Sequence, residues 1–305
     1  MKKTAAKKIR NREEYRETGN KMIRIENADM GEYTSFRCGG KADLLLIPDT
    51  PEELREALKE ENVLLLGNGS DTLFKDGGYH GTVIKPGEGF AEITVDGDTI
   101  KAGSAALLSQ VAKVAAAASL SGLEPLSGIP GSIGGAVFMN AGAYGGEMKD
   151  VLVSVTALSV STGELIDLAA DKLDLSYRHS IFTETGDVII SATMKLTPDD
   201  KDSIDARMKD FTDRRNDKQP LQYPSAGSFF KRPEGYFAGK LIQDAGLKGV
   251  SVGGAQVSEK HSGFIINTGN ATADDIIHLM RLVQNTVYDK FGVMLEPEVH
   301  IVGED

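Results

Sequence analysis

A glycine-rich segment in the middle of the chain restricts its fold more than any other feature. Gly122–Gly146 holds eight glycines in 25 residues, and 34 of all 305 residues are glycine, against a usual share of ~7%. The segment is not low in complexity. We therefore expect ordered loops whose backbone approaches another group closely, as a residue without a Cβ permits.

Three glycine-containing loops are candidate phosphate sites. The first, Gly67–Asp71 (GNGSD), follows the apolar run Val63–Leu66, which we predict to be a buried strand. The second is Ser127–Ala136 (SGIPGSIGGA), where Ser132–Gly135 is expected to begin a helix, and the third is Asn140–Gly145 (NAGAYG). Backbone N–H groups in such loops and at helix N-termini converge on phosphate oxygens. Three loops in one chain favour a diphosphate ligand.

The usual nucleotide motifs are absent from these loops. Neither of the first two ends in Gly-Lys-Ser/Thr, and Thr72 stands where a dinucleotide fingerprint has its third glycine. A single Gly-x-Gly after a strand is also typical of an ordinary turn. The sequence thus predicts neither a P-loop nor a Rossmann site.

Charge and cysteine content exclude several classes. The net charge of -11 and pI near 5.1 argue against a nucleic-acid binder. The first 24 residues carry nine Lys/Arg and three Glu, typical of a binding tail or of a solvated helix. No apolar run follows to make a signal peptide, and none is long enough for a membrane span. The single cysteine, Cys38, is predicted to be a small buried residue. A cytoplasmic location is expected.

Helix and strand patterns are mixed without regular alternation, which predicts an α+β fold. Thr50-Pro51-Glu52-Glu53 is typical of a helix start, and Thr272–Phe291 has the apolar spacing of an amphipathic helix. We expect a hairpin around Asp96-Gly97-Asp98 and a closing strand at Val293–Val302.

Several segments together resemble the UDP-N-acetylenolpyruvoylglucosamine reductase family. They are GNGSDTLF at 67–74, IPGSIGG at 129–135, NAGAYG at 140–145, SYRHSIF at 176–182, PSAGSFFK at 224–231 and LEPEV at 295–299. The resemblance spans about Tyr33 to Gly303. Each motif is weak alone, but the set in this order is specific.

The resemblance implies an FAD-binding region of the vanillyl-alcohol-oxidase type followed by a smaller α+β substrate-binding domain. The expected parts are a basic tail or helix at 1–21, FAD-binding subdomains at 22–85 and 86–200, and the substrate domain at 201–305. FAD is expected to be non-covalently bound, because no His or Cys stands in the glycine loops. The residues expected to bind it are Gly67, Asn68, Gly69, Ser70, Asp71, Ser127, Gly128, Ile129, Pro130, Gly131, Ser132, Gly134, Gly135, Asn140, Gly142, Ala143, Tyr144, Gly145, Val188 and Arg214.

The implied reaction reduces UDP-N-acetylenolpyruvoylglucosamine to UDP-N-acetylmuramate with NADPH, in peptidoglycan precursor synthesis. The catalytic residues implied are Arg178, Ser228 and Glu298. An arginine pairs with a carboxylate through two N–H groups and keeps its charge, so it suits a developing enolate. A serine hydroxyl can protonate the strongly basic enolate carbon, and Glu298 is expected to help hold the enol form.

Taken without the resemblance, the same three residues have ordinary explanations. Arg178 is typical of a surface ion pair, Ser228 after Gly227 of a turn, and Glu298 of an exposed strand residue.

Other groups are expected around the substrate. Tyr177, Arg178, Lys231 and His261 are the predicted substrate-binding residues, since a diphosphate needs local cations in an acidic protein. Lys218, Arg232 and Lys240 are as typical of a solvated surface as of a substrate-binding site. The five histidines lack metal-ligand spacing to one another, so no metal site is expected.

One departure from the family concerns the segment after Arg178. Some members carry a long insertion there with a tyrosine that closes over the nucleotide. Here Val188 follows only ten residues after Arg178. The chain thus resembles the shorter subgroup, and the group that covers the diphosphate is left open.

Two other functions remain open at this point. A related FAD-dependent oxidase would pass electrons to oxygen, and a non-catalytic flavin- or sugar-nucleotide-binding module would not need all three catalytic residues. Beyond the substrate and NADPH, no nucleic acid or membrane partner is expected. The sequence fixes no oligomeric state, and a monomer is the expectation.

Overall fold

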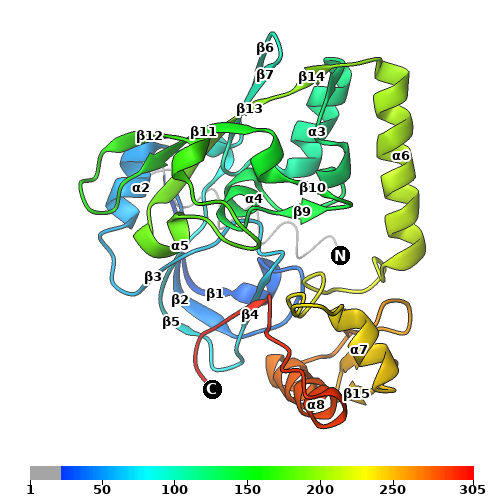
Figure 1. The fold of residues 1–305 in the computed structure, drawn as a ribbon. Helices are drawn as coiled ribbons and strands as arrows, with labels where there is room; N and C mark the ends of the chain where they lie inside the picture. Colours follow the sequence, from blue (N-terminus) through cyan, green and yellow to red (C-terminus); the bar gives the residue numbers. More distant parts are fainter. Residues whose placement is uncertain (1–21) are drawn as a thin grey trace, which may run out of the picture. The chain divides into compact units, whose positions relative to one another are not determined.

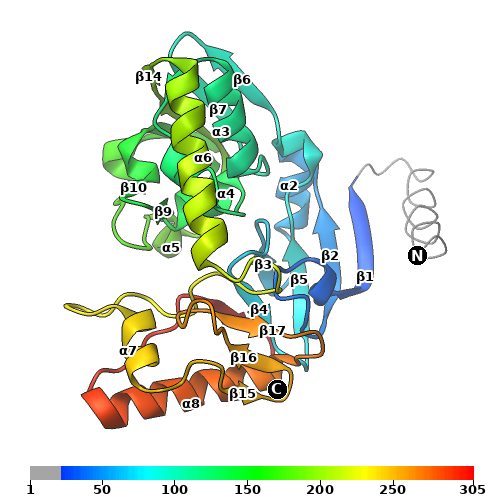
Figure 2. The same cartoon turned by 90° about the vertical axis from the view of Figure 1, so that its right-hand side faces the viewer.

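The structure, a computed structural model, describes residues 22–305. The predicted basic tail or helix at 1–21 lies outside these residues. The described chain forms two compact units (Figures 1 and 2). Unit 1 comprises 22–26, Leu44–Asn68 and Gly81–Phe211, and unit 2 comprises Asn27–Asp43, Gly69–His80 and Thr212–Asp305.

A four-stranded sheet has the order β1-β2-β5-β3, and the division between the units falls within three of its strands. Its strands are β1 (Ile23–Asp29), β2 (Lys41–Ile47), β5 (Tyr79–Ile84) and β3 (Val63–Leu65). In unit 1, β3 pairs in parallel with β5. α2 (Pro51–Ala57) begins as predicted, because the Thr50 side chain accepts the Glu53 N–H.

Unit 1 also contains a five-stranded antiparallel sheet of order β12-β11-β13-β7-β6. Its strands are β6 (Ile93–Asp96), β7 (Thr99–Gly103), β11 (Leu152–Leu158), β12 (Leu165–Ala169) and β13 (Val188–Lys195). Asp96 pairs with Thr99, so Gly97-Asp98 forms the two-residue turn of the predicted hairpin. The hairpin β6–β7 appears at the top of Figure 1.

The remaining elements of unit 1 lie around this sheet. They are η3 (Glu88–Phe90), α3 (Leu108–Ala117), β8 (Leu120–Ser121), η4 (Glu124–Leu126), α4 (Ile133–Phe138), β9 (Gly142–Ala143), β10 (Gly146–Glu147), η5 (Met148–Asp150), η6 (Ala170–Lys172), α5 (Phe182–Thr185), β14 (Thr197–Pro198) and the first part of α6 (Lys201–Lys218). Side chains from α3, α4 and the sheet share one apolar core that includes Val111, Val137 and Val155.

Unit 2 has its core between a small sheet and a long helix. Its elements are β4 (Thr72–Phe74), α7 (Ala238–Asp244), β15 (Ser251–Val252), β16 (Ala255–Val257), β17 (Ile265–Asn267), α8 (Ala273–Phe291) and β18 (His300–Val302). α8 lies along β15, β16 and β17, as Figure 2 shows, and buries Ile276, Leu279 and Val283. A capping box of Thr272 and Asp275 starts α8, as predicted.

Two local predictions were wrong. Of the segment 293–302, His300–Val302 is a strand, and it pairs in parallel with β4. Pro297 lies before it and cannot donate to a ladder. In the run at 63–66, Val63–Leu65 is a strand but not a buried one, since Leu65 is 38% exposed.

The predicted α+β class is confirmed, because parallel and antiparallel pairs and separate helices coexist. Cys38 is buried as expected. Burial, aided by the nearby carboxylates of Asp76 and Asp275, raises the pKa of its thiol to about 12. Within residues 22–305, no helix is both long and apolar enough to cross a membrane.

Candidate active site

The first two glycine loops meet in unit 1. A Cβ on Gly67 would lie 3.1 Å from the Ser132 Oγ and 3.9 Å from the Gly135 Cα. The Asn68 side-chain amide donates to the Pro130 carbonyl at 2.5 Å. Two loops from distant parts of the sequence thus present backbone to the same small region.

Helix α4 begins in this region, with Ser132 at its N-cap, as predicted. The N–H groups of its first two residues are already committed, since Ile133 donates to the Ala106 carbonyl and Gly134 to the Ser104 carbonyl. In the first turn of α4, the N–H of Gly135 is therefore the one that does not donate to the Ser104–Ala106 segment. The helix start offers fewer donors to a phosphate than its sequence suggested.

Two polar residues that the sequence analysis missed lie where the first two glycine loops meet. The Lys85 ammonium donates to the Gly67 carbonyl at 2.6 Å, and burial lowers its pKa while Glu88 acts to raise it. The Ser104 Oγ is buried and has no hydrogen-bond partner among the described residues. The strand end at Lys85 and the small-residue run Gly103–Ala106 were the available signals.

These features fit the diphosphate of an FAD. A glycine backbone without side chains faces a second loop, a buried hydroxyl lacks a partner within the described chain, and a lysine stands beside the loop. A buried hydroxyl without a hydrogen bond is costly unless a ligand supplies one.

The second half of the first loop lies in unit 2. Gly69 has φ +64°, and a Cβ there would come 2.1 Å from the Tyr33 carbonyl oxygen, so both conformation and space require glycine. Asp71 accepts the His300 N–H through its carbonyl, which places it beside β18. Gly67 and Asn68 belong to unit 1, so the predicted loop is divided between the units.

The third loop forms a tight hairpin in unit 1. β9 pairs with β10, and Tyr144 and Gly145 form its turn with φ +53° and +89°. Both central residues have positive φ, as a type I′ turn requires. The Tyr144 ring lies 5.0 Å from the Phe211 ring. Val188, another predicted FAD residue, is 4% exposed in an apolar core.

Arg178 lies at the tip of a turn whose backbone is unusual. Ser176 and His179 exchange backbone hydrogen bonds, so Tyr177 and Arg178 are the central residues. Arg178 has φ +55°, a conformation that costs a residue with a side chain about 1–2 kcal/mol. Its guanidinium lies 4.9 Å from the centre of the Tyr177 ring. Such strain is typical of positions held for a function.

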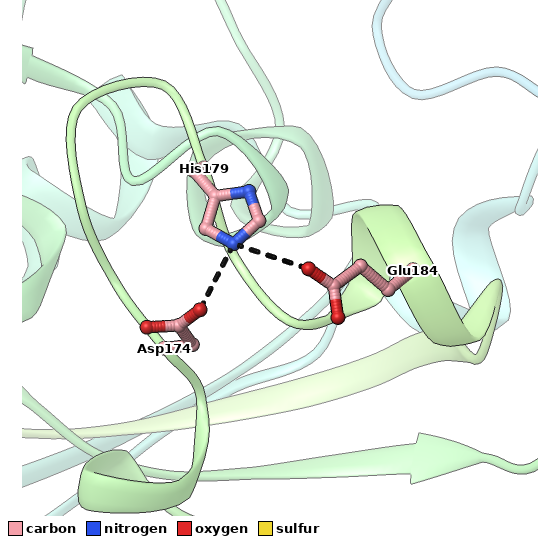
Figure 3. A group of neighbouring side chains, drawn as sticks. All are labelled: Asp174, His179 and Glu184. Atoms are coloured by element: carbon pink, nitrogen blue, oxygen red, sulfur yellow. Dashed lines mark hydrogen bonds and ion pairs between the residues drawn. The ribbon is translucent and has the colours of Figure 1, made fainter.

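The last residue of the same turn, His179, belongs to a small polar cluster (Figure 3). The Nε2 of His179 lies 3.2 Å from a carboxylate oxygen of Asp174 and 4.0 Å from one of Glu184. These are ligand types for a divalent cation, and they form the one such group found among residues 22–305. The sequence analysis considered only the spacing between histidines, so it did not identify this group of one histidine and two carboxylates. Both carboxylates are mostly exposed, and the histidine bonds already account for the geometry.

Ser228 and Glu298 belong to two segments of unit 2 that pair with each other. The segment Ser228–Lys231 runs beside Glu296–Glu298: the Glu298 N–H donates to the Phe229 carbonyl, and the Lys231 N–H donates to the Glu296 carbonyl, both at 2.8 Å. Phe229 is buried and anchors this segment, whereas Ser228 is exposed. The backbone pairing therefore brings the segment of the predicted proton donor to the segment of the predicted carboxylate.

Two predicted substrate-binding groups lie in the same unit. The Lys231 ammonium forms a close ion pair with Glu296. The Nδ1 of His261 accepts the Gly263 N–H at 3.1 Å, so a neutral ring carries its proton on Nε2. Burial lowers the pKa of His261, and nearby Lys218 lowers it further. Arg214 lies in the part of α6 that belongs to unit 2.

Comparison with known proteins gives a consistent result. A family model described as an FAD binding domain matches residues 42–169, and one described as the C-terminal domain of UDP-N-acetylenolpyruvoylglucosamine reductase matches 219–302. Proteins named UDP-N-acetylenolpyruvoylglucosamine reductase from Agathobacter rectalis and Clostridium botulinum are each 52% identical to this chain. The matches cover 92% of this chain and 94% and 93% of theirs.

A solved structure is also similar. The UDP-N-acetylenolpyruvylglucosamine reductase of Thermus caldophilus superposes with a TM-score of 0.82 at 36% identity. The match covers 92% of this chain and 99% of that one.

Proposed function

The chain belongs to the UDP-N-acetylenolpyruvoylglucosamine reductase family and is an FAD-dependent oxidoreductase, and on that premise we propose that it reduces UDP-N-acetylenolpyruvoylglucosamine to UDP-N-acetylmuramate with NADPH. The observation that carries the proposal is the backbone pairing of Ser228–Lys231 with Glu296–Glu298, which joins the two segments that hold the predicted proton donor and the predicted carboxylate and leaves Ser228 exposed. A cytoplasmic location is part of the proposal.

Bound FAD would supply hydride transfer from the nicotinamide to the methylene carbon of the enolpyruvyl group. Gly67, Asn68 and Lys85 would hold the loop against which its diphosphate binds, and the Ser104 Oγ would donate to it. The same assignment extends to the other predicted FAD residues of the second loop and to Gly142, Ala143, Tyr144 and Gly145 of the third.

Arg178 pairs with the substrate carboxylate, where negative charge increases as the hydride arrives. Its permanent charge stabilises that state without proton transfer. The turn holds its backbone in a fixed, left-handed conformation, so the guanidinium needs little reorganisation.

Ser228 supplies the proton that completes the reduction. Its O–H bond breaks as a C–H bond forms at the carbon that bears the carboxylate, and the hydroxyl is restored from water. Glu298, whose N–H donates to the carbonyl of Phe229, orients the enol form. Lys231 and His261 bind the nucleotide part of the substrate.

Anaerobic stopped-flow absorbance tests the proposal directly. The enzyme is reduced with NADPH and mixed with UDP-N-acetylenolpyruvoylglucosamine, while the flavin band is followed. Rapid return of the oxidised spectrum with formation of UDP-N-acetylmuramate is expected. A flavin that stays reduced until air is admitted would instead support an oxidase.

The role of Ser228 has its own test. Ser228→Ala is expected to keep reduction by NADPH but to slow reoxidation by the substrate by roughly 10²–10⁴-fold, the usual contribution of a positioned acid. Ser225→Ala, three residues earlier in the same segment, serves as the matched control and should reoxidise normally. Near-normal turnover of Ser228→Ala would refute the assignment.

A further inference from the structure

Asn140 is completely buried and makes hydrogen bonds on both sides of its side-chain amide. Its Nδ2 donates to the Ser176 carbonyl and to a Glu147 carboxylate oxygen, each at 3.0 Å. Its Oδ1 accepts the Lys149 N–H at 2.9 Å. Both amide hydrogens are therefore used within the protein, which argues against a direct bond from this amide to FAD.

The bond to Ser176 reaches the turn that carries Arg178. Ser176 is the first residue of that turn, two positions before Arg178. At the other end, the buried Ser180 donates through its Oγ to the Phe138 carbonyl at 2.7 Å. Phe138 and Asn140 lie just two residues apart, at the end of α4. The turn is thus fastened at both ends to the same short piece of backbone.

Glu147 adds an electrostatic link to the same turn. Its carboxylate accepts from Asn140 and pairs with Lys149 at 2.7 Å. The hydrogen bond from Lys149 has the largest effect in lowering the pKa of Glu147, and the Asn140 bond and the positive charges of Lys149 and Arg178 lower it further. Asn140 therefore also fixes a carboxylate whose field reaches the guanidinium.

From these contacts we propose that Asn140 is a positioning residue for Arg178. It holds the Ser176 carbonyl, and with Ser180 it keeps the strained turn in the one conformation that directs the guanidinium. The residue types suit this task, since an aspartate at 140 would lack both donors and repel Glu147. The inference rests on the proposed function, in which Arg178 acts on the substrate carboxylate.

A double-mutant cycle tests the coupling. Asn140→Ala, Arg178→Ala and the double variant are compared by the rate of substrate-driven flavin reoxidation at saturating substrate, after reduction by NADPH. We expect Asn140→Ala alone to lower this rate roughly 10- to 100-fold, because small misplacement of a catalytic group has effects of that order. In the Arg178→Ala background it should lower the rate less than about threefold.

A matched control separates this effect from lost stability. Asn267 in unit 2 is also a buried asparagine, whose Nδ2 donates to the Phe36 carbonyl and whose Oδ1 accepts from Gly269 and Ala271. Any effect of Asn267→Ala on reoxidation should be equal with and without Arg178. FAD content and reduction by NADPH, measured on the same samples, should stay within about threefold of the wild type for Asn140→Ala.

The outcomes distinguish the two levels of the hypothesis. If the losses in reoxidation rate caused by Asn140→Ala and by Arg178→Ala multiply in the double variant, Asn140 does not act through Arg178 and the inference is overturned. If Arg178→Ala reoxidises normally, the proposed role of Arg178 fails instead. Should Asn140→Ala not fold, Ser180→Ala replaces it in the cycle: a loss that disappears in the Arg178→Ala background supports the inference, and a multiplicative loss overturns it.

Discussion

Single residues in the FAD region are placed by contacts that their sequence neighbourhood does not show. Lys85 ends a strand in the sequence, yet its ammonium reaches back to the carbonyl of Gly67. Ser104 lies in a run of small residues, and both the residue and its hydroxyl oxygen are buried. Motifs identified Arg178 and Ser228 as candidates, but neither Lys85 nor Ser104 belongs to a motif, and the strand end and the small-residue run that contain them do not by themselves indicate a ligand site.

Lys85 gives a prediction at this scale. Lys85→Met should raise the Kd for FAD roughly tenfold or more, because a hydrogen bond to a charged group contributes about 1.5–3 kcal/mol. Titration of apoprotein with FAD, followed by flavin fluorescence, measures this. Lys101→Met, at an exposed position of β7, is the matched control. An unchanged Kd for Lys85→Met would contradict the role given to the ammonium.

At the scale of elements, most helices and strands were predictable because their signals are local. Caps at Thr50 and Thr272 and the turn at Gly97 act within a few residues, and each is confirmed. The structure of the segment before β18 could not be predicted, because its backbone bonds to Phe229 and Lys231 depend on a partner far away in the sequence. The Arg178 turn was equally unpredictable, since an arginine rarely adopts positive φ.

Helix α6 depends on one polar anchor within unit 1. Arg207 donates to the buried carboxylate of Glu124 through Nε at 3.0 Å and Nη2 at 2.8 Å. Burial alone would raise the pKa of Glu124, but hydrogen bonds from Gly122, Ser121 and Arg207 outweigh it and lower the pKa. The helix is otherwise highly charged and buries Ile204 in this unit.

Replacing this anchor should weaken unit 1. Arg207→Met is expected to lower the free energy of unfolding by about 1–3 kcal/mol, since a buried carboxylate loses a charged partner. Lys201→Met, which breaks an exposed pair with Asp205 on the same helix, should cost less than about 0.5 kcal/mol. Urea unfolding compares the two variants, and equal losses would show that Arg207 is no anchor.

At the scale of the whole molecule, the chain visits each unit more than once. Unit 2 takes Asn27–Asp43 and Gly69–His80 from the first third of the sequence and joins them to the C-terminal third. There β4 pairs with β18 from the opposite end of the chain. A linear search for composition changes cannot detect such an arrangement, because no linker marks it.

The pH dependence of stability follows from groups in both units. The pKa of His261 is lower in the fold than its ordinary 6.5. Between these values the unfolded chain binds more protons, so stability should fall as the pH drops below about 6.5. Glu124 and Asp275 also have lowered pKa values, so a further loss should follow below about pH 4.5.

Urea midpoints measured from pH 7 to pH 5 test the first of these losses. His261→Asn, whose amide oxygen can accept the Gly263 N–H, should flatten the decline in this range. His80→Asn is the matched control, because His80 is exposed and lies beside Asp43. An equal decline in the wild type and in His261→Asn would show that another group is responsible.

Cys38 has a practical consequence for studying this enzyme in solution. It is the chain's single cysteine, it is buried, and its thiol stays protonated at neutral pH because its pKa is about 12. Maleimide dyes react with thiolates, so Cys38 should not be labelled in the native protein. One new surface cysteine in each unit, such as Lys113→Cys and Asp289→Cys, would therefore accept a donor–acceptor dye pair with no competing reaction at Cys38.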